Sequence, residues 1–318
     1  MKRVLLLLST VLGIYMGIPL AAHAQQNPQF SQYMFNGLFL NPAYAGSKGY
    51  TSLSTSVRTQ WTGLPGAPLS QTVGIDGNLN KKLGAGVTIM HDRLGPQRFT
   101  EATVSSAVRI DLSRKTKLAV GISLGATQQV MDGTMLTPAE RDDYAIPMGV
   151  ERAIRPNAKL GAYLFSDIFY AGASVGNLVL FKEGLPTDPR PHFYLTTGGI
   201  IDLGRNMKFK PSVLLKEDFS GPAALDLNAF MLFKEQIWLG ASFRTTLNIF
   251  NDETYAMNTR LGNAMAAMVE FYASPRLRFG YSYDYSLNVF QNYSSHEISV
   301  GYFFLKKQYG RMLTPRYF

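Results

Sequence analysis

The chain of 318 residues has no cysteine, four histidines and few charged residues. Without cysteine there is no disulfide framework, no thiol nucleophile and no cysteine-ligated zinc or iron–sulfur site. Charged residues make up only 17% of the chain and hydrophobic residues 46%, which excludes a disordered protein. The formal net charge of +9 is spread thinly, without the basic cluster and interleaved aromatic residues of a nucleic-acid-binding surface. We therefore expect a folded protein that binds no nucleic acid.

Residues 1–24 have the pattern of a secretory signal peptide. Lys2 and Arg3 precede a long apolar run, and Ala22-His23-Ala24 forms a small-residue cleavage site. A membrane-anchoring helix is the alternative, because the run is longer than usual, but Pro19 favours cleavage. No later run reaches the roughly 18 apolar residues of a membrane helix. The mature chain is therefore expected to be periplasmic, secreted, or a membrane β-barrel.

Apolar and polar residues alternate with period two along several segments. In 276–285, Leu277, Phe279 and Tyr281 lie on one face, and Arg278, Gly280 and Ser282 lie on the other. A soluble sandwich shows the same alternation, but these segments run to about ten residues, the length of a tilted membrane strand. The pattern predicts an all-β fold, a transmembrane antiparallel β-barrel of about 14 strands over residues 51–305. The expected strands are 51–61, 68–78, 83–91, 98–111, 115–129, 155–165, 168–176, 192–203, 207–216, 223–233, 236–247, 258–273, 276–285 and 295–305.

The connections between these strands alternate in length, and aromatic residues gather at strand ends. Short turns on one rim and long loops on the other are typical of outer-membrane barrels, as are aromatic girdles at both membrane surfaces. The aromatic sites are Phe169-Tyr170, Phe193-Tyr194, Phe271-Tyr272, Tyr283 with Tyr285, and 302–304. The longer connections are expected at 62–67, 91–97, 130–154, 177–191, 217–222, 248–257 and 286–294.

The short turns and the C-terminal tail, residues 306–318, are basic. With an even number of strands, both chain termini are expected on the short-turn, periplasmic side. The basic charge has two interpretations: a solvated rim that stays out of the bilayer, or a docking surface for an acidic periplasmic partner. The basic residues of this rim are Lys81, Lys82, Arg114, Arg205, Lys306, Lys307 and Arg311.

The segment before the first strand, residues 25–50, is the most distinctive part of the sequence. Phe30, Tyr33, Met34 and Leu38 are spaced as one face of a short helix, and Pro42 ends it. This segment is expected to fold into the barrel as a plug. The alternative is an aromatic anchor that rests on the inner membrane surface.

At this segment the sequence resembles the PorP/SprF family, outer-membrane proteins of the type IX secretion and gliding-motility systems of Bacteroidetes. The similarity spans the mature chain from end to end and includes Gly280–Tyr285 and Ser295–Ser299. The residues that carry it near the N-terminus, taken as candidate plug or partner contacts, are Gln29, Phe30, Gln32, Tyr33, Asn36, Asn41, Pro42, Ala43, Gly46, Arg58 and Trp61.

The resemblance implies an outer-membrane, non-enzymatic role without a cofactor. Its implied partners are periplasmic ring and peptidoglycan-linking components of the type IX machinery, a secreted adhesin C-terminal domain, and outer-membrane lipid. A plugged channel for hydrophobic solutes is the alternative function. A membrane hydrolase is a third, and it would depend on His192 or His296, because a serine–histidine pair can assemble across strands without a local motif.

Overall fold

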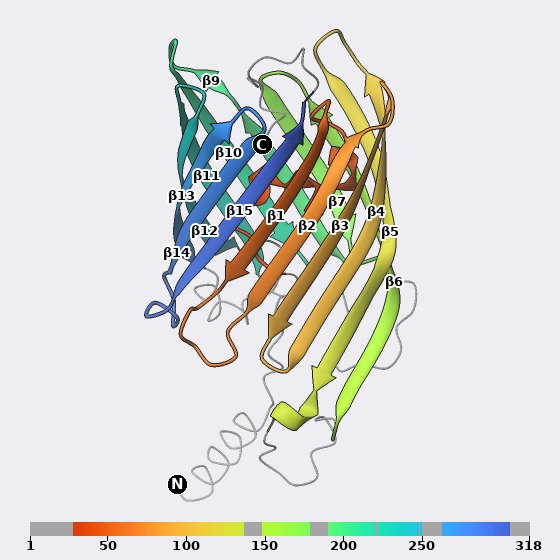
Figure 1. Ribbon diagram of the computed structural model, residues 1–318, viewed down its shortest axis with the longest axis vertical. Helices are drawn as coiled ribbons and strands as arrows, with labels where there is room; N and C mark the ends of the chain where they lie inside the picture. Colours follow the sequence, from red (N-terminus) through yellow and green to blue (C-terminus); the bar gives the residue numbers. More distant parts are fainter. Residues whose placement is uncertain are drawn as a thin grey trace, which may run out of the picture.

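The computed structural model is a closed antiparallel β-barrel (Figure 1). It describes residues 28–136, 148–178, 190–219, 222–247, 249 and 263–305. β8 and β9 both pair with β10 and form one strand that is interrupted at Ile200, so fourteen strands close the barrel through the β1–β15 and β10–β11 pairings. The predicted 14-strand antiparallel barrel is confirmed. The strands are β1 (Thr51–Thr59), β2 (Leu69–Asn78), β3 (Leu83–Leu94), β4 (Gln97–Asp111), β5 (Lys117–Asp132), β6 (Val150–Phe165), β7 (Phe169–Gly176), β8 (His192–Gly199), β9 (Ile201–Asp202), β10 (Met207–Glu217), β11 (Ala223–Phe233), β12 (Ile237–Leu247), β13 (Ala264–Ser274), β14 (Leu277–Ser286) and β15 (Ser294–Phe304).

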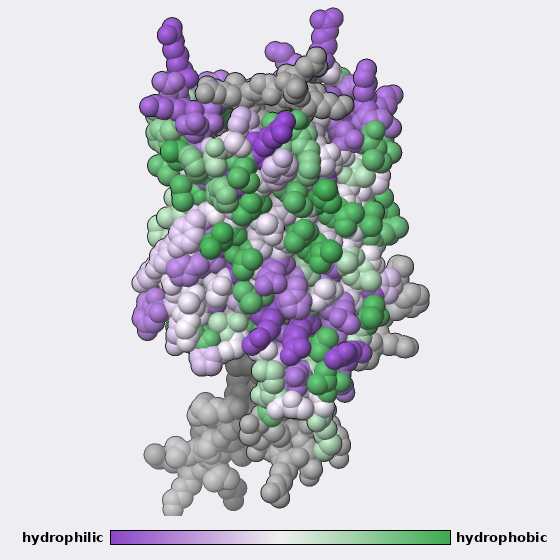
Figure 2. Space-filling model, in the orientation of Figure 1, coloured by the Kyte–Doolittle hydropathy of each residue, from purple (hydrophilic) through white to green (hydrophobic). Residues whose placement is uncertain are grey.

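The alternation read from the sequence separates the outside of the barrel from its interior. On β5, Val120 and Leu124 point outward and are 51% and 58% exposed, whereas Ser123 between them is 2% exposed. Figure 2 shows the outward apolar side chains as a green band below the purple rim at the top. A barrel that is apolar outside and polar inside suits a lipid environment. Among the described residues, no helix is long and apolar enough to cross a membrane.

The connections fall into two sets, which define a short-turn end and a long-loop end. The short-turn end holds the β2–β3 turn, the β4–β5 turn and the start of β1, at the top of Figure 1. Two expected long loops at the other end are wrong in extent. β3 continues to Leu94 and β4 begins at Gln97, which leaves a two-residue turn, and β5 and β6 extend to Asp132 and from Val150. Pairing between the strands therefore continues into segments that were expected to be loops.

Tyr283 and Tyr285 both point outward, whereas directly adjacent aromatic residues divide between the two faces of the barrel instead of forming girdles together. Phe169 is 39% exposed on the outside, whereas its neighbour Tyr170 is 7% exposed and points inward. In the same way Tyr302 and Phe304 point outward, and Phe303 is 1% exposed. Because successive strand residues face opposite sides, only one member of each adjacent pair can contact lipid.

Candidate functional site

The N-terminal segment Pro28–Tyr50 forms three short 3-10 turns instead of one helix. These turns are η1 (Tyr33–Phe35), η2 (Gly37–Phe39) and η3 (Pro42–Tyr44). Asn36 and Asn41 separate them, each with a backbone φ of −141°, and Pro42 provides no N–H to continue a helical ladder. The single helical face expected over residues 30–38 is therefore wrong, although Tyr33, Met34 and Leu38 are all buried.

The segment lies inside the barrel, because it contacts strands on opposite sides of it. The side-chain amide of Asn228 on β11 donates to the Tyr33 hydroxyl, and Asn41 donates to the carbonyl of Ala162 on β6. The Gly46 N–H donates to Asp76 on β2. One segment can reach β2, β6 and β11 together only from the interior, where Figure 1 shows its red turns. Burial raises the pKa of the Tyr33 phenol well above its ordinary value, so its hydroxyl stays protonated.

The segment runs from the long-loop end to the short-turn end. Ser31 contacts Glu297, which lies near the start of β15 at the long-loop end, and Gly46 contacts Asp76 near the short-turn end, where β1 begins. Leu305, after β15, also lies at the short-turn end. The expected position of both termini on the short-turn side stays a prediction, because residues 1–27 and 306–318 lie outside the described residues.

The first part of the segment is held by a buried ionic cluster. The Glu297 carboxylate accepts hydrogen bonds from the backbone N–H groups of Ser31 at 2.7 Å and Gln32 at 3.3 Å. Arg58 donates to Asp284 at 2.7 Å and to Glu297 at 3.4 Å, and it is 2% exposed. Buried charges of this kind are stable only when they are paired. Arg58 therefore holds two carboxylates, one of which anchors the N-terminal segment.

The second part of the segment fits against glycines of the barrel wall. Asn41 donates to the carbonyls of Ala162 at 2.9 Å and Ala173 at 3.3 Å, and its Oδ1 accepts from the Ala43 N–H at 2.9 Å. A Cβ added to Gly161 would collide with the Asn41 side-chain oxygen, and one added to Gly121 would collide with the Ala43 backbone. The absence of side chains at these strand positions makes room for the turn η3.

Lys48, near the end of the segment, and Asp76 on β2 form a second ionic contact. The Lys48 Nζ lies 3.8 Å from Asp76 Oδ1, and the Ser52 hydroxyl donates to the same oxygen at 2.7 Å. Burial lowers the pKa of Lys48, and the neighbouring Asp76 carboxylate opposes this shift. Asp76 accepts the Gly46 N–H as well, so it joins the segment to both β1 and β2.

Sequence reasoning missed further ion pairs that fill the interior. Asp226 lies 2.8 Å from Arg244 and 3.1 Å from Lys216, and Glu270 lies 3.2 Å from Arg278. The alternation places each of these residues on the inner face, but no local pattern indicates which of them meet across strands. These buried side chains lie inside the barrel together with the N-terminal segment.

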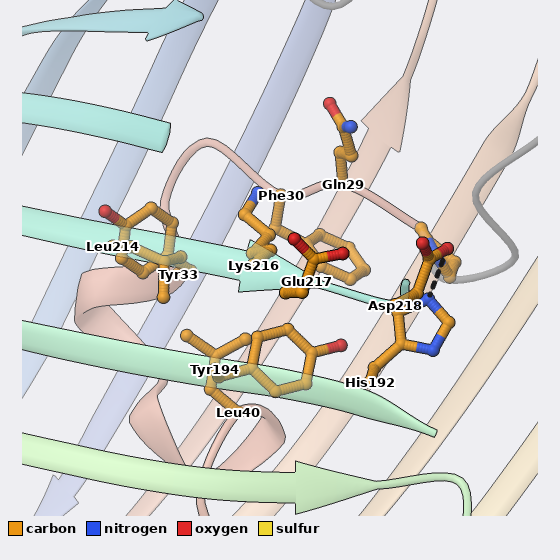
Figure 3. A pocket seen from close by; sticks show the side chains of 11 residues that line it. Gln29, Phe30, Tyr33, Leu40, His192, Tyr194, Leu214, Lys216, Glu217 and Asp218 are labelled. Carbon is orange, nitrogen blue, oxygen red and sulfur yellow. Dashed lines mark ion pairs between the residues drawn. The ribbon is translucent and has the colours of Figure 1, made fainter. Parts of the chain in front are cut away.

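A small cavity lies where the segment enters at the long-loop end (Figure 3). Phe30, Tyr33 and Leu40 contribute its apolar side, and Figure 3 shows His192 and Asp218 beside each other at one edge, with 3.7 Å between Nε2 and Oδ2. The cavity has a volume of about 30 Å³. Such a space holds one or two water molecules.

The second candidate histidine, His296, lies on the outer face of β15. Its Nε2 lies 3.0 Å from the Ser294 hydroxyl and its Nδ1 lies 2.8 Å from the Tyr281 hydroxyl. In a serine–histidine–aspartate triad a carboxylate holds the second nitrogen, and here a phenol does so. Among the described residues, no three histidine or acidic side chains gather as a metal site.

The remaining predicted residues lie at the two ends of the barrel. Trp61, at the long-loop end, stacks on Phe290 with 4.1 Å between ring centroids. The basic side chains of the predicted rim within the described chain are exposed on short turns: Lys81, Lys82, Arg114 and Arg205. Lys306, Lys307 and Arg311 lie outside the described residues.

Solved structures similar to this chain share its barrel fold. The CymD monoaromatic hydrocarbon channel matches with a TM-score of 0.53 and 12% identity, over 84% of this chain and 91% of that chain. The TodX monoaromatic hydrocarbon channel deltaS2 mutant matches with a TM-score of 0.50 and 10% identity, over 85% of this chain and 94% of that chain. At this identity the likeness shows the fold alone.

Comparison with protein families supplies the identity. No curated protein matches the chain. The family model described as type IX secretion system membrane protein PorP/SprF matches residues 22–302, nearly the whole chain. The chain is an outer-membrane β-barrel and belongs to the PorP/SprF family of type IX secretion system membrane proteins.

Proposed function

We propose that this protein serves type IX secretion by binding other proteins, without catalysis and without conducting solutes. The observation that carries the proposal is the filled interior: the N-terminal segment crosses the barrel and is held by the Glu297 and Asp76 carboxylates. We propose that this segment is a permanent plug. A plugged barrel offers its partners two surfaces, the short-turn rim and the long loops.

The short-turn rim suits an acidic partner in the periplasm. Exposed basic residues project from three turns around this end, so their charges are distributed over the rim: Lys81 and Lys82 on the β2–β3 turn, Arg114 on the β4–β5 turn and Arg205 on the β9–β10 turn. Exposed charges of one sign steer an oppositely charged partner and set its orientation. We assign this rim to the periplasmic ring and peptidoglycan-linking components, and the long-loop end to a secreted adhesin C-terminal domain.

Hydrophobic-solute transport is the second candidate, favoured by the apolar cavity at the long-loop end and by the similarity in fold to the CymD and TodX monoaromatic hydrocarbon channels. The small volume of this cavity argues against solute transport. A cavity that binds benzene has a volume of about 150 Å³, whereas this one has about 30 Å³. Solute passage would therefore require the N-terminal segment to leave the barrel.

Two measurements separate these functions. Deleting the gene is expected to reduce export of type IX cargo and to abolish any gliding, and unchanged export would refute the secretion role. The purified barrel in planar bilayers is expected to show no steady conductance. Stable single-channel currents or uptake of an aromatic hydrocarbon by the barrel alone would support the transport function instead.

A further inference from the structure

At the long-loop end β6 extends beyond its neighbour β7, and together with the end of β5 it forms an arm, defined here as residues 127–132 and 150–156 (Figure 1). One edge of this arm is paired, because β5 pairs with β4 as far as Met131. The other edge is not, because β6 pairs with β7 only from Leu160 onward. Among the residues that the structure describes, no strand other than β5 pairs with β6 between Val150 and Pro156.

The direction of the backbone groups along this edge follows from one hydrogen bond. The Ala158 carbonyl accepts from the Leu178 N–H and therefore points away from β5. Backbone groups of alternate residues in a strand point to the same side. The N–H and C=O groups of Arg152 and Ile154 thus face the open edge, while the ladder to β5 uses the residues between them. The backbone of Pro156 also faces the open edge, so its missing N–H costs no hydrogen bond in the ladder to β5.

The side chains along the edge include exposed apolar residues. Ile154 is 69% exposed and Val150 is 49% exposed, and Met148, next to the arm, is 98% exposed. Free strand edges are normally shortened, charged or covered, because they pair with other extended chains. Arg152 and Pro156 limit the usable edge here to a few residues.

We propose that this edge is a docking site for a short extended strand of an exported protein, which adds to the arm by β-augmentation. The unpaired backbone groups require an extended backbone as partner, and Ile154 and Val150 provide apolar cross-strand contacts for alternate side chains of that strand. The inference rests on the proposed role in secretion, because it places the exported partner at the long-loop end. A second copy is a poor occupant, since two barrels in one membrane hold their tilted β6 strands crossed instead of side by side.

The first test changes the edge without changing the barrel. Ile154→Pro removes an edge-facing N–H and leaves the ladder to β5 intact, whereas the control Ile154→Thr keeps that N–H in a residue that favours strands. The readout is type IX cargo retained on intact cells, measured by quantitative proteomics. We expect Ile154→Pro to lower it about fivefold or more and Ile154→Thr to change it less than about twofold. Equal retention in the two variants would overturn the proposal.

The second test needs no proline and uses the absence of native cysteine. Arg152→Cys places a thiol on the edge, and Met148→Cys places a control thiol off it. Intact cells are labelled with a membrane-impermeant maleimide, in a strain that exports cargo and in one whose translocon is blocked. We expect labelling at position 152 to be several-fold slower only in the exporting strain, with no difference at position 148. Equal labelling at position 152 in both strains, or a disulfide-linked homodimer through it, would overturn the proposal.

Gene deletion separates this inference from the proposed function. If deletion leaves cargo export unchanged, the secretion role fails and the docking site fails with it. If deletion blocks export while the proline variant and the edge thiol behave like their controls, only the docking site is refuted. Barrel formation in each variant is checked on an SDS gel, where a folded barrel migrates differently before and after boiling.

Discussion

Arg58 and Asp284 are 226 positions apart in the chain, and Arg58 Nη2 lies 2.7 Å from Asp284 Oδ2 inside the barrel. Arg58 is on β1 and lies opposite Glu297 on β15, at the seam where the first and last strands pair. The Ser31 hydroxyl donates to the same Asp284 oxygen. One guanidinium therefore links the closure of the barrel to the position of the N-terminal segment.

Replacing Arg58 with methionine is expected to destabilise the barrel by about 3–5 kcal/mol, because Asp284 and Glu297 would remain buried without their cation. The free energy of unfolding can be measured by urea titration in detergent with tryptophan fluorescence. The control is Arg114→Met, which removes the same charge from an exposed turn. Equal stability of the two variants would contradict the role assigned to the buried cluster.

Gly161→Ala is expected to displace the turn η3, because the added methyl group would collide with the Asn41 side chain. Overpacking of this kind costs about 1–3 kcal/mol. The control is Gly149→Ala, where no atom lies within 4 Å of the added Cβ. Limited proteolysis and bilayer conductance report on the segment. If the Gly161→Ala barrel resists protease as well as the control and conducts no more current than it, the fit of Asn41 against Gly161 is unimportant.

The alternation of residue types was enough to predict the strands, because a tilted strand between lipid and a polar interior must alternate along its whole length. By the same alternation Gly84 and Gly86 lie on the inner face, where added Cβ atoms would meet Ala45 and Leu38 of the N-terminal segment. Both facts are local: each residue's face follows from its position along the strand.

What could not be predicted depends on contacts between distant residues. Nothing in the sequence near Asp226 indicates that Arg244 and Lys216 will both reach it, since strand register decides this. The helical spacing over residues 30–38 was misleading because the barrel wall, and not a helix, buries Tyr33 and Leu38. The loop expected at 91–97 was shortened by continued β3–β4 pairing.

Leu124→Arg is expected to destabilise the barrel by about 2–4 kcal/mol, because it places a charge on the outward face within the apolar band. Leu124 is 58% exposed on β5. Val289 is even more exposed, at 72%, but lies in the loop between β14 and β15. Val289→Arg should therefore change the urea midpoint in lipid vesicles very little. Comparable losses in both variants would show that the outer face of β5 is not in contact with lipid.

The double variant Lys81→Glu with Lys82→Glu is expected to weaken binding of the periplasmic machinery, because it reverses charge on the short-turn rim. After crosslinking in native membranes, recovery of ring components should fall about fivefold, and wild-type recovery without crosslinker should fall as salt screens exposed charges. Arg93→Glu with Arg98→Glu is the matched control, since it makes the same change of charge at exposed positions toward the long-loop end. If both pairs reduce recovery equally, net charge and not the rim determines binding. If neither does, the basic turns are only a solvated border of the membrane.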